Sequence, residues 1–198
     1  FKAKGSGKSG LISTSRPGPE VMRRTAVEFN NIALVVRFEV GFPANGRTIN
    51  AQELEKILLE FLPEIVKTCL FYRSWEKAKI QTCYELAENQ QRIREVLEER
   101  KLVAFCANGS ILPRKSGVSS QPLKGAIEFQ SPESMEISID LPFGNSIRGM
   151  GIPEGVTLII GGGYHGKSTL LQALEQGVYN HIKGDGREYV ITRADALK

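Results

Sequence analysis

A glycine-rich segment carries the clearest chemistry in this sequence. Gly161 and Gly166 enclose four residues and are followed directly by Lys167 and Ser168, which is the spacing of a phosphate-binding P-loop. Glycines let backbone N–H groups converge on phosphate oxygens, and a lysine ammonium at this position can reach the β- and γ-phosphates. The Ser168 hydroxyl can complete the coordination of Mg²⁺. We therefore expect the segment to bind a nucleotide.

ATP and Mg²⁺ are the expected ligands of this segment, with Ser168 as the magnesium ligand. The predicted nucleotide contacts are Gly161, Gly162, Gly163, Tyr164, His165, Gly166, Lys167, Ser168 and Thr169. Within this set, Tyr164 and His165 are interpreted as loop residues whose side chains face solvent. The catalytic residues are left unassigned.

The flanking residues indicate how the loop is held. A β-branched apolar run at 156–160 predicts a strand before the loop. Leucines at helical spacing predict a helix over 167–176, ended by Gly177. Such a helix directs the positive end of its dipole toward a bound phosphate. A glycine-rich turn arising by chance is the less favoured interpretation.

A P-loop ATPase also needs a carboxylate that binds the magnesium and polarises water. No apolar run ending in an acidic pair follows Lys167. We therefore expect that carboxylate beyond residue 198 and no hydrolysis by residues 1–198 alone. The sequence begins at Phe1 without an initiator Met, and we interpret it as an internal piece of a longer protein.

Composition is that of a globular protein, with 41% hydrophobic and 24% charged residues. The length allows one large or two small domains, and no apolar stretch is long enough to span a bilayer. Cys69, Cys83 and Cys106 are widely spaced, which predicts neither a disulfide framework nor a zinc site. We expect an intracellular protein of the cytoplasm or an organelle matrix, with any targeting segment outside this sequence.

The net charge of +4 is unevenly distributed. Residues 1–24 and 101–125 are basic and contain many Gly and Ser residues. Lys8, Arg114 and Lys115 are the candidate contacts to phosphates of a nucleotide or a nucleic acid. Solvated loops that keep the protein in solution are an equally good interpretation, and the alternatives stay open.

The remaining pattern predicts a mixed α/β fold. Strands are expected within 26–40 and at 102–107, 135–141, 146–150 and 189–192. The strands at 135–141 and 146–150 are expected to form an antiparallel hairpin, and Gly184-Asp185-Gly186 a turn.

One helical turn is expected at 20–24. A helix is expected to begin with a capping box of Asn50 and Glu53 and to be interrupted by Pro63, where a second helix starts. Ser74 is expected to cap a long polar helix from Trp75 to about Arg100, which carries Glu88 and Arg92 as a salt-bridge pair. The narrow apolar stripe of the long helix predicts a surface helix or an arm against a partner.

Several segments together resemble the predicted ATPases of the ABC class, a soluble, non-transporter family. They are residues 105–118, 129–134, 148–156, 161–169 and 177–188. The resemblance implies a P-loop NTPase fold with an ABC-type ATPase core and its antiparallel subdomain. It places part of an N-terminal α+β domain at residues 1–125 and the start of the core at 126–198.

The resemblance further implies an ATP-binding part of an ATPase whose cores close as a homodimer, with no membrane partner. An aromatic residue upstream of the loop commonly stacks on adenine in such cores. Phe129 or Phe143 is therefore a candidate, although core packing is the favoured interpretation of each. The alternative function is a nucleotide-regulated RNA-binding protein that uses the basic segments 1–24 and 101–125.

Members of this family often carry the name of an isomerase, isopentenyl-diphosphate isomerase. We reject that activity, because His165 and His181 are the only histidines and the sequence holds no metal-binding constellation.

Overall fold

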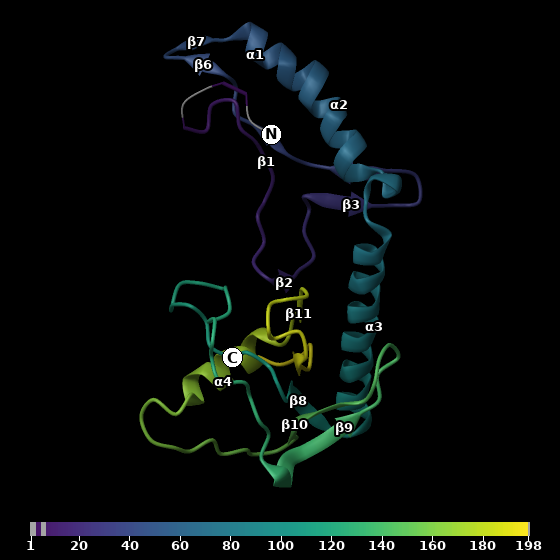
Figure 1. The fold of residues 1–198 in the computed structure, drawn as a ribbon, viewed down its shortest axis with the longest axis vertical. Helices are drawn as coiled ribbons and strands as arrows, with labels where there is room; N and C mark the ends of the chain where they lie inside the picture. Colours follow the sequence, from purple (N-terminus) through teal and green to yellow (C-terminus); the bar gives the residue numbers. More distant parts are fainter. Residues whose placement is uncertain (1–2, 5–6, 198) are drawn as a thin grey trace. The chain divides into compact units, whose positions relative to one another are not determined.

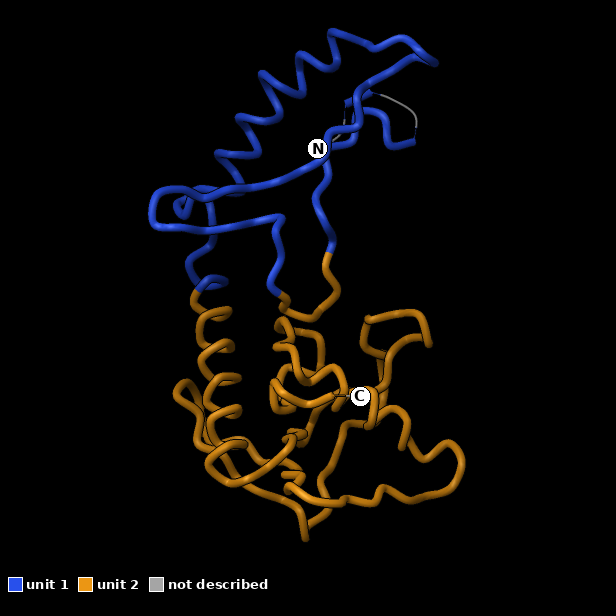
Figure 2. Tube along the Cα trace, turned by 180° about the vertical axis from the view of Figure 1, so that it is seen from behind, with its two compact units in different colours: residues 1–16, 23–80 blue, residues 17–22, 81–198 orange. Residues whose placement is uncertain are grey.

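The computed structural model describes residues 3, 4 and 7–197, and the chain forms two compact units (Figure 2). The first unit comprises residues 1–16 and 23–80, and the second comprises residues 17–22 and 81–198. The domain boundary expected after residue 125 falls inside the second unit.

The first unit consists of short antiparallel strand pairs and a helical segment (Figure 1). Its elements are β1 (Ile12–Ser13), β3 (Val27–Phe29), β4 (Leu34–Val36), β5 (Glu39–Val40), β6 (Ala44–Asn45), β7 (Thr48–Ile49), α1 (Ala51–Lys56) and α2 (Leu62–Ile65). Strand β1 pairs with β5, β3 with β4, and β6 with β7. The expected strand region 26–40 is thus a hairpin, because the Asn30 side chain accepts hydrogen bonds from the N–H groups of Ile32 and Ala33 and turns the chain.

The helical segment begins as predicted, because the Asn50 side chain accepts a hydrogen bond from Glu53 N–H. Pro63 does not interrupt it, contrary to the prediction. Helical conformation continues through π-helical turns at Ile57–Phe61 and Val66–Leu70 to a short 3-10 turn at Tyr72–Ser74. The first π turn shifts the Leu62 N–H to the Ile57 carbonyl, five residues back, and this wider turn accommodates the proline that comes next.

A four-stranded antiparallel sheet organises the second unit, in the order β12-β8-β10-β9. The elements of this unit are β2 (Glu20–Val21), α3 (Lys77–Glu99, from residue 81 on), β8 (Leu102–Ala107), a 3-10 turn (Glu133–Met135), β9 (Glu136–Ile139), β10 (Ile147–Pro153), α4 (Lys167–Gln176), β11 (Asn180–His181) and β12 (Val190–Thr192). The predicted hairpin is confirmed, with Ile147 of β10 opposite Ile139 of β9.

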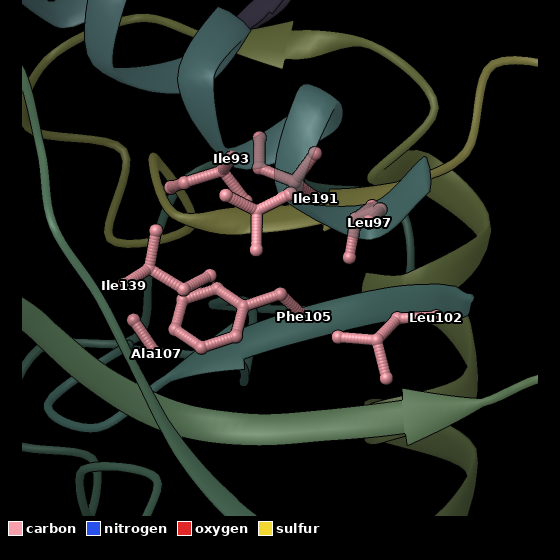
Figure 3. Packing of buried hydrophobic residues seen from close by; sticks show 8 residues of the cluster. Ile93, Leu97, Leu102, Phe105, Ala107, Ile139 and Ile191 are labelled. Carbon is pink, nitrogen blue, oxygen red and sulfur yellow. The ribbon is translucent and has the colours of Figure 1, made fainter. Parts of the chain in front are cut away.

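Alternation along β8 divides the core into two layers. Phe105 and Ala107 face α3, whereas Ala104 and Cys106 face α4. Figure 3 shows Phe105 beneath Ile93 and Leu97 of α3, with Ile191 and Ile139 beside them. Leu97 and Phe105 are fully buried, so α3 is a core helix on one face rather than only a surface helix or arm.

The charge pairing of α3 also differs from the prediction. The expected Glu88–Arg92 pair does not form; Arg92 instead contacts Glu95 at 3.3 Å and Glu99 at 2.7 Å. Ser74 does not cap this helix, because its hydroxyl donates to the Lys67 carbonyl and α3 begins only at Lys77.

Residues 20–24 do not form the predicted helical turn. Glu20 and Val21 form β2, which pairs with β11 so that His181 lies opposite Glu20. A pairing between residues 161 positions apart overrides the local preference of a short polar segment.

The strand predicted at 156–160 is absent. Val156 and Ile160 are largely exposed, and no strand among residues 3, 4 and 7–197 pairs with this run. An extended segment becomes a strand only when a neighbour satisfies its backbone hydrogen bonds, and β8 already has β10 and β12 on its two sides.

Candidate functional site

The glycine-rich loop leads directly into α4 (Figure 1). Gly166 precedes the helix with φ of 77°, and Tyr164 has φ of 61°. Both values lie in the left-handed region, which turns successive N–H groups toward one side. The first-turn N–H groups of α4 have no partner within the helix, so they and the helix dipole favour an anion at this end.

The Lys167 side chain folds over the loop. Its Nζ donates to the Gly161 carbonyl at 2.7 Å and also to the Gly162 carbonyl. The ammonium therefore lies against the backbone at the start of the loop.

The other loop side chains have separate placements. His165 is exposed, and its Nδ1 accepts a hydrogen bond of 3.2 Å from Gly162 N–H, so the imidazole links the two halves of the loop. Tyr164 is fully exposed, as its interpretation as a solvent-facing residue predicted. Ser168 is exposed in the first turn of α4, and Thr169 is half-buried.

A cleft of about 580 Å³ adjoins the loop. Tyr164, His165, Gly166, Lys167 and Thr169 line one side of it. A second group of lining residues, called the apolar wall below, comes from the basic segment and from the stretch after it: Leu112, Pro113, Leu123, Ala126, Ile127 and Phe129. Ile159, Ile160 and Leu170, which flank the loop, also line the cleft. The lining of the cleft thus combines the Lys167 cation with apolar surface, a combination that suits a nucleotide.

The structure separates the two aromatic candidates for adenine stacking. Phe129 lines the cleft. Phe143 lies elsewhere, with its ring edge-on to Tyr84 at 5.7 Å and its backbone bonded to the Asn89 side chain at 2.8 and 3.0 Å. Phe143 therefore has the packing role that was its favoured interpretation.

The three basic candidates occupy different environments. Lys115 is exposed in the basic loop, and Lys8 is exposed in a turn. Gly5 and Ser6, which precede that turn, lie outside the described residues. The Arg114 side chain is buried and engaged, with its guanidinium bonded to the Asp185 carboxylate at 2.7 Å. In this structure its charge is directed inward rather than toward a ligand.

Sequence reasoning missed a buried polar network around Asp185. His181 Nδ1 lies 2.7 Å from Asp185 Oδ2, and Arg187, which is completely buried, donates to the Leu112 carbonyl at 3.0 Å. The available signal was the Gly184-Asp185-Gly186 segment, where an acid between two glycines fixes a turn. It was interpreted only as a turn.

The charges of this network perturb its titration. Burial lowers the pKa of Arg187 to about 10, and the nearby Arg114 charge contributes to the same effect. Burial alone would raise the pKa of Asp185, but the hydrogen bond with His181 and the Arg114 charge outweigh it and hold that pKa below its ordinary value. Asp185 therefore remains ionised and paired at neutral pH.

The described part of the chain contains no group of three His, Cys, Asp or Glu side chains arranged to hold a metal ion. Ser168 is the predicted magnesium ligand. Its exposed hydroxyl in the first turn of α4, beside Lys167, fits that role. None of the helices in the described ranges is long and apolar enough to cross a membrane.

Comparison with protein families assigns both parts of the chain. The ABC ATPase family model described as a P-loop domain matches residues 76–198, and the model described as the N-terminal region of the ATPase of the ABC class matches residues 1–73. An uncharacterized protein of Methanocaldococcus jannaschii is 39% identical over 118 residues. That match covers 56% of this chain, and the chain spans only 26% of the relative's length.

Proposed function

Because this chain belongs to the family of ABC-class ATPases, we propose that it binds Mg-ATP at the loop formed by residues 161–169. The observation that carries the proposal is the Lys167 ammonium, held over the loop carbonyls at the positive end of α4. The β- and γ-phosphates would replace these carbonyls as partners of Lys167, because an ionised acceptor binds an ammonium more strongly than a neutral one.

The magnesium ion would be held by Ser168, whose hydroxyl is accessible in the first turn of α4. When bound, Mg²⁺ neutralises charge on the β- and γ-phosphates. The protein's own contribution is to orient the phosphate chain through backbone N–H groups of the loop and through Lys167. Thr169, half-buried at the cleft, is placed for the α-phosphate side.

The base would lie against the apolar wall of the cleft. Phe129 and Ile127 offer apolar surface there, and the wall is tied by backbone hydrogen bonds of 2.9 Å between Phe129 and both Gly109 and Ser110. Burying a purine between such side chains would exclude water from one face of the ring. This assignment selects Phe129 over Phe143.

Hydrolysis needs further groups. No acidic side chain of the described residues lines the cleft, so we propose that the carboxylate that polarises water is supplied elsewhere in the full protein. Closure of two ATPase cores as a homodimer is the corresponding proposal for the complete site.

Calorimetry on the full protein tests the proposal. Lys167→Ala should lower ATP affinity by about a hundredfold or more, because a charged hydrogen-bond donor to the phosphates is lost. Lys183→Ala, which removes an exposed lysine outside the loop, is the matched control and should leave affinity unchanged. Equal affinities for wild type and Lys167→Ala would refute the site.

A second candidate function is binding of a nucleic-acid backbone, favoured by a basin in the first unit. This cavity of about 610 Å³ is lined by Arg23, Arg24 and Arg37, with hydroxyls of Thr14, Ser15 and Thr25. Arg37 is neutralised by Glu28 at 2.9 Å, whereas Arg24 Nε is buried and has no hydrogen-bond partner among the described residues. A buried donor without a partner, next to a second arginine, favours the binding of a phosphate in this cavity. The negative charge of the Glu39 carboxylate, which also lines the cavity, opposes the binding of a phosphate.

A salt series distinguishes this second function. In filter binding of single-stranded RNA by the full protein, the double variant Arg23→Ala and Arg24→Ala should make the slope of log affinity against log salt shallower by roughly 1.4, for two phosphate contacts on a single strand. Lys183→Ala serves again as control. An unchanged slope would refute this cavity as a binding site for a nucleic-acid backbone.

A further inference from the structure

A buried ion pair connects the wall of the cleft to the turn after β11. Arg114 and Asp185 have side chains that are only 7% and 1% exposed, and the guanidinium contacts both the Asp185 carboxylate at 2.7 Å and its backbone carbonyl at 2.8 Å. Two contacts from one planar group fix the direction of Arg114 as well as its distance.

The Asp185 side of this pair is attached to the end of α4. His181 bonds to Asp185 through Nδ1, and its Nε2 lies 3.3 Å from the carbonyl of Gln176, the last residue of the helix. Arg187 adds a second connection, since it bonds to the Gln176 side chain at 3.0 Å. The far end of the helix that carries the P-loop is therefore held by the same cluster.

The Arg114 side of the pair is continuous with the apolar wall. Leu112 and Pro113 precede it directly, and the Leu123 N–H donates to the Pro113 carbonyl at 3.0 Å. The cluster also holds the wall at Leu112, whose carbonyl accepts from Arg187 Nε at 3.0 Å. All three apolar residues belong to the apolar wall of the cleft.

From these contacts we infer that Arg114, through its pair with Asp185, is a positioning residue for the nucleobase: it sets the apolar wall of the cleft at the correct distance from the phosphate loop. This inference rests on the proposed Mg-ATP site. It predicts that the ion pair affects recognition of the base and not of the phosphates, because α4 and its loop are also held by contacts that do not involve Arg114. These include the hydrogen bond of 2.6 Å from the Thr192 hydroxyl to the Leu174 carbonyl.

The test compares two ligands on the full protein. ATP has both a base and phosphates, whereas inorganic tripolyphosphate offers only the phosphates. For Arg114→Met we expect ATP affinity to fall by about tenfold and tripolyphosphate affinity to change by less than about twofold. Arg92→Met, which removes an arginine from an exposed ion pair on α3, is the matched control and should alter neither affinity.

Lys167→Ala separates the two proposals, because it should weaken both ligands. If Lys167→Ala has no effect on either ligand, the Mg-ATP site itself is refuted. If Lys167→Ala weakens both ligands while Arg114→Met weakens neither, or weakens both equally, the positioning role is overturned and the site stands. If Arg114→Met does not fold, Arg114→Lys replaces it in the test. This variant keeps the charge but loses the bidentate contact, so it should show the same selective loss of ATP affinity to a smaller extent.

Discussion

Arg94 and Asn180 are joined by two hydrogen bonds, in which the guanidinium donates to Oδ1 at 3.2 and 2.9 Å. The same guanidinium donates to the carbonyls of Gly177 and Val178 just beyond α4, and to Thr192 in β12 at 2.6 Å. A cation from α3 therefore satisfies the carbonyl groups at the C-terminal end of the P-loop helix, where the helix dipole favours positive charge.

Replacing Arg94 should be costly. Arg94→Met removes five hydrogen bonds and leaves partly buried carbonyls unpaired, so the free energy of unfolding should fall by about 3 kcal/mol. Urea denaturation measures this change. Arg92→Met, on the exposed side of the same helix, should cost less than about 1 kcal/mol; equal losses for the two variants would contradict the capping role.

Packing against β12, and not a left-handed backbone, requires a glycine at position 177, the C-cap of α4. Its φ of −62° is open to any residue, but a Cβ would lie 2.8 Å from the Thr192 hydroxyl and 2.9 Å from the Val190 carbonyl. Gly177→Ala should therefore destabilise the protein by about 2 kcal/mol through overpacking against β12. Gly117→Ala, where a Cβ meets open space, is the control in the same thermal melts, and similar melting temperatures for both would disprove the clash.

Ser168→Ala should change the dependence of ATP affinity on magnesium. The hydroxyl is proposed to contact the ion and not the phosphates, so affinity in Mg²⁺ should fall by roughly tenfold while affinity in EDTA stays unchanged. Calorimetry under the two conditions measures the difference. Equal losses with and without Mg²⁺ would assign Ser168 to the phosphates.

Asp185 should contribute to acid sensitivity. Its pKa is lowered in the folded protein, so its stabilisation is fully present above the unfolded pKa, near 4, and is lost as pH falls through the folded pKa. Asp185→Asn should therefore be less stable than wild type at pH 7, with a gap that narrows below about pH 4. Melting curves from pH 7 to pH 3 test this, with the exposed Asp140→Asn as control. A gap that stays constant with pH would contradict it.

The three thiols should differ in reactivity. Burial raises the pKa of Cys106 to about 12, whereas Cys69 and Cys83 are exposed. A disulfide reagent at pH 8 should therefore modify two thiols quickly and the third only after unfolding, because the thiolate is the reacting species. Fast modification of three thiols in the folded protein would show that the β8 core opens readily.

Local signals predicted the elements that depend on neighbours in sequence. Helix α4 has both predicted ends, because a glycine before Lys167 and leucines at helical spacing define it within ten residues. The Asn50 cap was equally local, although only half of the expected capping box forms: the Glu53 carboxylate accepts from Lys4 N–H at 3.2 Å instead. Family resemblance supplied the ABC-class assignment.

Long-range contacts account for what was missed. The pairing of Glu20 with His181 and the bond from Arg114 to Asp185 join segments 161 and 71 residues apart, and no periodicity reports such partners. The strand prediction at 156–160 was wrong for a related reason. Its apolar residues have strand propensity, but no strand among the described residues lies beside them to pair with. The burial of Arg114 was not predicted, because a basic residue in a glycine-rich segment gives no sign of being buried.

Helix α4 is held at the end opposite to its loop, so a rotation about that end would displace the loop. Gln176 is held by His181 and Arg187, while the loop at the opposite end lies among exposed residues. Ten residues of helix are about 15 Å long, so a rotation of about 5° around the held end moves the loop by roughly 1.3 Å. Displacements of that size are enough to change the alignment of reacting groups substantially. The hydrogen bond from Thr192 to Leu174 and the burial of Ala173 and Leu174 oppose this rotation along the length of α4, so the helix can keep the loop in place when one contact at Gln176 is lost.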